Sequence, residues 1–508
     1  MKRTAPIALA SLLLGLVFNF FFYGQNIGLN FFLYSGLLLA LTFYLLSYFR
    51  YKASGSLVVV AGLVLFFSAT TFIRASGFLT FLNVVFVLYL LLLIVSLARK
   101  PQTKLSDYVF QDYLVGILQL PFRFIGEFMN FASLLVSSGQ TLRQNGRTVT
   151  PVIRGILLSL PFLFVFLLLF SSADLVFNKY VGSLFDLNLS EDFVARSLLV
   201  LFVASLFSGA YSLMFTRSTS EQPAPATTPK RISLGSIEST IILGSVAFLF
   251  LIFIGVQIAY LFGGQEAIKE AGFTYSEYAR KGFFELIAVA VIALLLILAL
   301  NSSSKRTTLK ERVVFMWLCG LLIFEVLFVM FSAHKRLGLY EQAYGFTTLR
   351  LFSHIFIGWL ALIFAILMVH IGREQSDKKL AFQMFLSVVA IMAVVNFINP
   401  DAFIARQNIQ RFKETGRIDV LYLTLLSEDA TPVVSELLKD PNEKLSSAIA
   451  HELHGQRIRS DAMKSDWRSF NLSRAKAKRI LSANSQKLEA NSNYQFSPNE
   501  LDNSAPKN

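Results

Sequence analysis

The sequence is poor in the residues that disulfide-bonded proteins and soluble enzymes rely on. It has 508 residues and one cysteine, Cys319, so no disulfide can form within the chain. Only 15% of its residues are charged, against about 25% in a typical soluble domain. The chain also lacks a His-Glu-x-x-His zinc motif, a Gly-x-Ser-x-Gly nucleophile motif and a phosphate-binding loop. These absences exclude an internal disulfide framework and weigh against an enzyme.

Long apolar stretches fill most of the remaining sequence. Hydrophobic residues make up 55% of the chain, and the mean hydropathy is +0.58. Apolar windows of about 20 residues are long enough to cross a bilayer, and continuous rather than alternating runs favour helices over a barrel. We therefore expect an all-α polytopic bundle of about eleven transmembrane helices. The predicted spans are 5–23, 27–48, 56–73, 77–98, 152–171, 194–215, 236–262, 282–300, 313–332, 351–371 and 380–398.

The spacing of these spans predicts the organisation of the membrane part. Residues 1–100 hold a group of four transmembrane helices, and 151–400 hold a seven-helix membrane domain. Between them, 101–150 mixes charged and aromatic residues, as helices lying in the membrane interface do. A Pro/Ser/Thr-rich linker at 217–231 interrupts the second group.

The composition changes after Pro400. Residues 401–485 carry apolar residues at helical spacing, with capping residues and Pro432 at a predicted helix start. This pattern predicts a small helical soluble domain. Residues 486–508, rich in Asn and Ser, are predicted to be disordered.

The net charge of +14 is better explained by a membrane than by nucleic acid. If the N-terminus is cytoplasmic, that side receives more of the Lys and Arg residues in the connections, although the basic residues just past the last span reduce the excess. An odd number of spans then places the C-terminus outside. We expect a protein of the bacterial inner membrane whose partners are the lipid bilayer and an envelope protein, and no nucleic acid is expected.

Ionisable side chains inside membrane spans are costly and raise a functional hypothesis by default. Glu325 lies well inside its span, and Glu285 and His354 lie near the outer starts of theirs. The neighbouring connections add aromatic and basic residues, so a polar cluster is predicted at the outer face. Its members are Arg280, Glu285, Glu325, Tyr340, Tyr344, Arg350 and His354.

Plainer explanations stay open for the same residues. Glu325 could be a hydrogen-bonding group between helices, and Tyr340 and Tyr344 could belong to the aromatic belt at the membrane surface. His451 and His454 resemble a zinc motif, but no third ligand is in view. We therefore predict neither a metal site nor a cofactor, and no catalytic residue can be assigned.

Four stretches carry a resemblance to a known family. They are YSEYARKGFFEL (275–286), YGFTTLRL (344–351), NPDA (399–402) and IDVLYL (418–423). In this order they resemble bacterial multipass membrane proteins grouped as domain of unknown function 4153/4173, over roughly 150–440, with the first four helices outside. The resemblance implies a bacterial inner-membrane protein and supplies no activity or substrate.

Three functions are compatible with these features. The first is a binding, sensing or scaffold protein of the bacterial envelope, which the long capped tail and the missing enzyme motifs favour. The second is a transporter or channel that uses Glu325, although the inner halves of the neighbouring helices are almost wholly apolar. The third is an envelope lipid-modifying enzyme, which would require Glu285, Glu325, Arg350 and His354 to converge.

Overall fold

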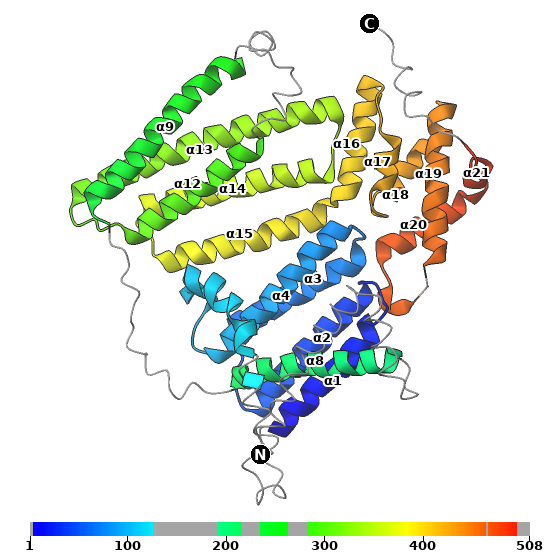
Figure 1. Ribbon diagram of the computed structural model, residues 1–508, viewed down its shortest axis with the longest axis horizontal. Helices are drawn as coiled ribbons and strands as arrows, with labels where there is room; N and C mark the ends of the chain where they lie inside the picture. Colours follow the sequence, from blue (N-terminus) through cyan, green and yellow to red (C-terminus); the bar gives the residue numbers. More distant parts are fainter. Residues whose placement is uncertain are drawn as a thin grey trace, which may run out of the picture. The chain divides into compact units, whose positions relative to one another are not determined.

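The computed structural model describes residues 4–124, 127–128, 191–215, 234–262, 283–463 and 466–494. Within these residues the chain is helical, and ten helices are long and apolar enough to cross a membrane. The predicted fold class, an all-α membrane bundle with further helices at the C-terminus, is confirmed. The predicted span 152–171 and the linker 217–231 lie outside the described residues. The helices form two compact units, which can be followed by colour in Figure 1.

Unit 1 contains residues 1–219 and 464–475. Its long helices are α1 (Thr4–Phe22), α2 (Leu29–Tyr48), α3 (Gly55–Ile73), α4 (Gly77–Arg99) and α8 (Glu191–Phe215). Short connections join α1 to α4, so consecutive helices run antiparallel. Val64, Phe67 and Leu90 are fully buried between them, whereas Leu9 and Val59 are more than half exposed. Helices that are apolar on both faces in this way suit a lipid surrounding.

Helix α8 packs with α1 and α4, so by its contacts it belongs with the first four helices rather than with the later group in which the sequence placed it. Near its start, Arg196 lies over the ring of Tyr23, just past the end of α1. Near its end, the Tyr211 hydroxyl is 3.1 Å from the Thr42 hydroxyl of α2. Helix α8 therefore runs antiparallel to α1, and it begins at the end of the unit opposite the one where α4 ends.

After α4 the chain folds back onto the unit through η1 (Leu105–Asp107) and the π-helical turn η2 (Asp112–Gly116). Tyr108 and Tyr113 are buried here. The Tyr113 hydroxyl donates to the Leu105 carbonyl at 2.8 Å, and Tyr89 of α4 donates to the Tyr113 carbonyl at 3.2 Å. These bonds fix the described beginning of the 101–150 segment; its interfacial placement stays a prediction.

A short segment from far along the chain completes unit 1. We call residues 466–475 the clasp; it includes η5 (Trp467–Ser469) and the start of α20 (Leu472–Ala483). Asn471, which is buried, donates to the carbonyls of Thr71 and Arg74 at 3.1 and 2.7 Å. The Leu29 N–H donates to the Phe470 carbonyl at 2.9 Å. The clasp thus binds the α1–α2 and α3–α4 connections together.

Aromatic and charged contacts reinforce the clasp. The Trp467 ring lies 6.1 Å from that of Phe21 in an edge-on arrangement. Arg468 donates to the Phe20 carbonyl and is paired with Asp466. Hydrogen bonds from Arg468 lower the pKa of the Asp466 carboxyl below its usual value. Gly28 allows this close approach, because a Cβ there would lie 2.6 Å from the Phe470 carbonyl oxygen.

Unit 2 contains residues 220–463 and 476–508. Its long helices are α9 (Ser236–Phe262), α12 (Phe283–Ser303), α13 (Leu309–Tyr344), α14 (Thr348–Gly372) and α15 (Asp377–Ile398). Helix α13 contacts α9, α12 and α14, and α15 packs on α14 (Figure 1). At one end of these helices lie the α12–α13 and α14–α15 connections, and at the other lies the α13–α14 connection. We call them the Arg306 end and the His354 end.

Helix α13 is longer than the sequence indicated. The expected span 313–332 was followed by a connecting segment up to Arg350, but the helix continues to Tyr344. Its 36 residues give a length of about 54 Å at ~1.5 Å per residue, which exceeds the bilayer core of ~30 Å. A capping box between Thr308 and Glu311 starts the helix, and Gly345, with φ of +81°, ends it. Residues expected in a loop are therefore held on a rigid helix.

The C-terminal helices surround a core of their own. They are α16 (Pro400–Thr415), α17 (Val420–Leu425), α18 (Thr431–Val434), η4 (Ser435–Lys439), α19 (Glu443–Ala462), the rest of α20, and α21 (Ser485–Ala490). Ile404, Val420, Ile449 and Leu488 are buried together in this core. Helix α21 ends at Ala490 and Leu488 is buried, so the described helices reach the first residues of the stretch 486–508. The disorder of that stretch stays a prediction.

Candidate functional site

Two imidazoles and a carboxylate form the polar core of the His354 end. His334 and Glu341 lie two helical turns apart on α13, and His354 lies in the second turn of α14. The two Nδ1 atoms of the histidines are 2.8 Å apart, and His354 Nε2 is 2.9 Å from Glu341 Oε2. We call these three residues the histidine cluster.

The geometry of the cluster links its protonation states. An ionised Glu341 can only accept, so His354 must donate from Nε2. A neutral His354 then accepts at Nδ1 from the Nδ1–H of His334. This leaves Nε2 of the exposed His334 ring as the basic nitrogen of the cluster. A proton added at that nitrogen leaves the contact between the two Nδ1 atoms intact, whereas a proton on Nδ1 of His354 as well would oppose two N–H groups across 2.8 Å. The contact therefore holds an N–H from only one of the two Nδ1 atoms.

Glu341 occupies a buried position beside a cavity. Its side chain is 4% exposed, and its second oxygen, Oε1, has no hydrogen-bond partner among the described residues. A buried carboxylate oxygen without a donor is costly, and such atoms are rare in native proteins. The cavity measures about 510 Å³ and lies between α13 and α16. Its lining is mostly polar: Gly338, Glu341, Gln342, Phe346, Gln407, Gln410, Arg411 and Glu414.

The turn between α13 and α14 is held by the C-terminal helices. Asn408 of α16 accepts from the Phe346 N–H at 2.7 Å and donates to the Phe346 carbonyl at 2.9 Å. The Tyr422 hydroxyl accepts from the Thr348 N–H at 2.9 Å, and Arg411 donates to the Gln342 carbonyl at 2.9 Å. The cavity and the histidine cluster are therefore connected mechanically to α16 and α17.

Three of the predicted site residues lie around this turn. The guanidinium carbon of Arg350 is 4.2 Å from the centre of the Tyr340 ring, and Arg350 also donates to the Gly345 carbonyl. The rings of Tyr340 and Tyr344 are 4.8 Å apart, and Tyr344 is 55% exposed. Arg350 thus closes the turn, and it forms no hydrogen bond with Glu325.

The remaining predicted site residues are Arg280, Glu285 and Glu325. Arg280 lies outside the described residues, and Glu285 is exposed in the first turn of α12. Glu325 is buried, with neither carboxylate oxygen hydrogen-bonded among the described residues. It precedes His334 by nine residues, about 13 Å along the helix at ~1.5 Å per residue. Within the described part of the chain, no hydrogen bond or ion pair joins Glu285, Glu325 or Arg350 to His354.

The sequence contained a signal for the two members that the prediction omitted. His334 and Glu341 are seven residues apart, a spacing that places two side chains on one face of a helix. The signal was hidden because 333–350 was taken as a connection, in which helical spacing has no meaning. Both residues could have been identified if α13 had been expected to extend beyond the bilayer core.

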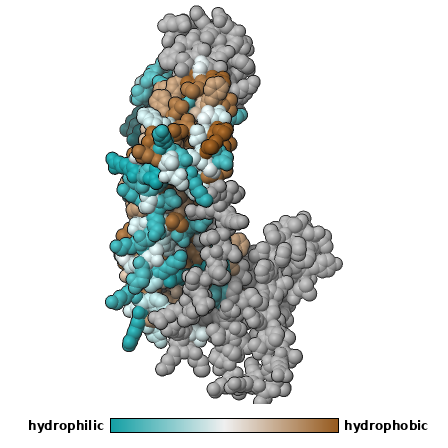
Figure 2. Space-filling view, turned by 90° about the vertical axis from the view of Figure 1, so that its left-hand side faces the viewer, coloured by the Kyte–Doolittle hydropathy of each residue, from teal (hydrophilic) through white to brown (hydrophobic). Residues whose placement is uncertain are grey.

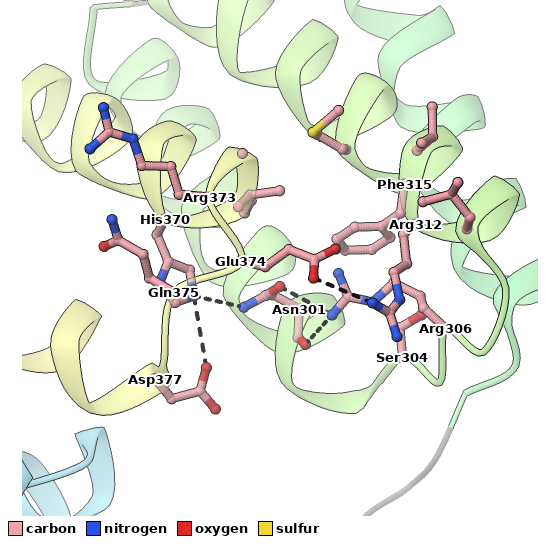
Figure 3. Close-up of a pocket in the computed structure, with 15 residues that line it drawn as sticks. Asn301, Ser304, Arg306, Arg312, Phe315, His370, Arg373, Glu374, Gln375 and Asp377 are labelled. Atoms are coloured by element: carbon pink, nitrogen blue, oxygen red, sulfur yellow. Dashed lines mark hydrogen bonds and ion pairs between the residues drawn. The ribbon is translucent and has the colours of Figure 1, made fainter.

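A second polar site lies at the Arg306 end (Figure 3). A cavity of about 660 Å³ is lined there by residues from the ends of α12, α13, α14 and α15. Arg306 donates to the carbonyl of Asn301 at 2.9 Å and to its side-chain oxygen at 3.2 Å, and its guanidinium lies 4.1 Å from the centre of the Phe315 ring. Partial burial lowers the pKa of Arg306 from its usual value. The guanidinium is held in place rather than free in solvent.

Opposite charges face Arg306 across this cavity. Arg312 and Glu374 form an exposed ion pair of 3.4 Å, and His370 Nε2 lies 3.8 Å from Asp377 and 3.4 Å from the Asn301 amide. Figure 3 shows Glu374 reaching toward the two arginines and Arg373 pointing away from them. Within the described residues, Ser304 Oγ, His370 Nδ1 and Gln375 Oε1 have no hydrogen-bond partner. The network is therefore incomplete at several lining residues.

Neither site is arranged as a metal centre. Among the described residues, no group of three or more His, Cys, Asp or Glu side chains could hold a metal ion. Of the two histidines whose spacing resembles a zinc motif, His451 has its Nδ1 3.3 Å from the Asn491 carbonyl, and His454 Nδ1 is buried.

Comparison with known proteins identifies the family. The family model described as "Domain of unknown function (DUF4153)" matches residues 61–437, which is more than half of the chain, and the protein belongs to this family. The match begins inside α3, so two of the first four helices lie within it, contrary to the expectation that all four lie outside. It includes the histidine cluster and both cavities. No curated protein and no solved structure matches the chain.

Proposed function

We propose that this multipass membrane protein is a binding and sensing protein of the bacterial envelope, and that the cavity beside Glu341 is its ligand site. The observation that carries the proposal is the buried Glu341 carboxylate, which has one oxygen on His354 and the other without a partner among the described residues. A ligand that donates a hydrogen bond to Oε1 would complete the site. The three glutamines, Arg411 and Glu414 of the lining suit a polar ligand.

The hydrogen bonds to the α13–α14 turn give the site a route to the rest of the protein. A ligand in the cavity contacts Gln342 and Phe346, and Asn408 holds the backbone of Phe346 from α16. Displacement of the turn would therefore be transmitted to the C-terminal helices. The bond of His354 to Glu341 joins the histidine cluster to the same turn, because Glu341 lies one turn before the end of α13.

The clasp supports an orientation in which the C-terminal helices lie outside the cytoplasm. Within unit 1 it binds the α1–α2 and α3–α4 connections, at the end of the helices away from Thr4 and from the end of α4. This segment of the C-terminal part therefore lies at the end of unit 1 away from Thr4. The excess of Lys and Arg on the N-terminal side supports a cytoplasmic N-terminus.

Glu325 supports a second candidate function. A buried carboxylate with no partner among the described residues suits a proton-coupled transporter. Binding and sensing is favoured because the charged side chains of α12 to α15 that form hydrogen bonds or ion pairs lie at the two helix ends, and no contact links Glu325 to either end within the residues described. A lipid-modifying enzyme is supported less. It would require Glu285, Glu325, Arg350 and His354 to converge, and no hydrogen bond or ion pair among the described residues joins them.

The proposal can be tested in living cells by crosslinking from inside the cavity. Gln410 is exposed and lines the cavity, so a photoreactive amino acid can replace it. We expect a discrete adduct on irradiation that is lost when Glu341→Gln is added. The control is Glu436→Gln, which removes an equal charge from the exposed surface of the C-terminal helices. No adduct, or an adduct that survives Glu341→Gln in normally folded protein, would contradict the proposal.

A further inference from the structure

The Arg306 cavity lies at the level where lipid headgroups meet the protein. Its lining comes from residues at the ends of four membrane-spanning helices: Ser304 follows α12, Leu309 begins α13, Gly372 ends α14 and Asp377 begins α15. Span ends coincide with the boundary between the hydrocarbon core and the polar headgroups. Figure 2 shows the side of Figure 1 on which these helix ends lie, with hydrophilic residues gathered over it.

The cavity presents charges of both signs. Arg306 donates to Asn301 through Nη2. Its other guanidinium nitrogens have no hydrogen-bond acceptor among the described residues, so they can donate to a ligand. Arg312 lies beside it with Glu374. The Asp377 carboxylate is 54% exposed and faces only the His370 ring among its described ion-pair partners. A purely anionic ligand would be repelled by the carboxylates, and a purely cationic one by the guanidiniums.

An apolar surface continues from the cavity along α13. Leu309 and Val313 line the cavity and are 76% and 39% exposed, and Trp317, one turn further on, is 71% exposed. These side chains face outward within a membrane span, where acyl chains are their natural neighbours. A molecule with a polar head in the cavity and apolar chains along α13 would fit both surfaces.

From this arrangement we propose that the Arg306 cavity binds the zwitterionic headgroup of a phospholipid, with its phosphate on Arg306 and Arg312 and its ammonium on Asp377. Arg306 is pre-organised by Asn301 and Phe315, and a guanidinium is a forked donor suited to phosphate oxygens. Asp377 can accept from a primary ammonium, which has three N–H donors, but not from a quaternary one. The site therefore prefers an ethanolamine headgroup to a choline headgroup.

The preference can be measured by native mass spectrometry of the full-length protein released from nanodiscs of defined composition. In equal mixtures we expect phosphatidylethanolamine to be retained about tenfold over phosphatidylcholine, a difference of about 1.4 kcal/mol. Phosphatidylglycerol, which has the phosphate but no ammonium, tests the second half of the site. Its retention at or above that of phosphatidylethanolamine would overturn the zwitterionic assignment, as would equal retention of all three lipids.

Matched variants separate the site from general surface charge. Asp377→Asn should abolish the discrimination between ethanolamine and choline while phosphate-dependent retention stays, and Arg306→Gln should lower retention of both. The control is Lys310→Gln, which removes one positive charge from the exposed first turn of α13 outside the cavity lining. Since Arg306→Gln also breaks the bonds to Asn301, Arg312→Gln serves as the second phosphate-side variant. Retention unchanged in both arginine variants, or lowered equally by Lys310→Gln, would overturn the proposal.

Discussion

The two ends of the unit 2 helices use polar side chains in opposite ways. At the His354 end, a carboxylate is 4% exposed and bound directly to an imidazole at 2.9 Å. At the Arg306 end, Arg312 and Glu374 are 48% and 64% exposed and 3.4 Å apart. Burial strengthens the first contact and makes its loss costly, whereas solvent screens the second. The same types of charge are therefore buried and closely paired at one end and solvent-exposed at the other.

The two ends also differ in which segments of the chain hold their connections in place. Asn408 and Tyr422 hold the α13–α14 turn from outside the membrane helices. At the other end, the α12–α13 connection is held by Leu234, just before α9, which donates to the Ser303 carbonyl at 3.1 Å and accepts from the Lys305 N–H at 3.0 Å. The exposed ion pair and the contacts around Asn301 link this connection to the α14–α15 connection. The first end is suited to transmitting a change to another domain, and the second to accepting a ligand from the membrane.

The largest expected effect is an all-or-none difference in which side of the membrane each end faces. The chain has one cysteine, Cys319, which is buried in a span, so a new cysteine is a clean reporter. In intact cells, a membrane-impermeant maleimide should label Lys439→Cys in the C-terminal helices and leave Lys310→Cys at the Arg306 end unlabelled until the cells are opened. Unmodified protein is the control. Labelling of Lys310→Cys alone would invert the proposed orientation, and labelling of both or neither would contradict an opposite placement of the ends.

A smaller but still severe effect is expected from breaking the fastened turn. Gly345 has φ of +81°, and a Cβ there would lie 2.7 Å from Asn408 Oδ1. Gly345→Val should therefore destabilise the C-terminal helices by on the order of 3 kcal/mol, from backbone strain and loss of the Asn408 bonds. Limited proteolysis and thermal unfolding in detergent measure the change. Gly358→Ala in α14 is the control, since nothing lies within 4 Å of its Cβ; an equal effect of both would show that the turn is not special.

The membrane spans and part of the candidate site could be predicted from the sequence. The spans follow from length and hydropathy, because lipid leaves a polypeptide few ways to satisfy its backbone, and ten of the eleven predicted spans coincide with helices in the described residues. His354 was selected by the cost of an ionisable group inside a span, and Tyr340, Tyr344 and Arg350 by their position in the neighbouring connection; all four lie near the α13–α14 turn.

The partners of those residues could not be predicted in the same way. The pairing of His354 with Glu341 depends on α13 continuing past the bilayer, which neither hydropathy nor charge reveals. The hydrogen bonds of Asn408 with Phe346 join residues that are 62 apart in sequence, and in the clasp the bond of Asn471 to Thr71 joins residues that are 400 apart. Contacts at such separations are set by tertiary packing, on which a local pattern has no bearing. The Arg306 cavity was hidden for a related reason: its arginines were attributed to membrane orientation alone.

The smallest expected change in the free energy of unfolding is at the exposed ion pair of Arg312 and Glu374. Comparing it with the buried Glu341 tests directly whether burial distinguishes the two ends. Arg312→Gln should change the free energy of unfolding by about 0–1 kcal/mol, and raising the salt concentration should erase even this difference. Glu341→Gln, which alters a buried charge-assisted bond, should cost about 1–3 kcal/mol and be nearly insensitive to salt. Chemical denaturation in detergent at low and high salt measures both. Equal costs with equal salt dependence would mean that burial does not distinguish the two ends, and the assignment of sensing to one and lipid binding to the other would lose its physical basis.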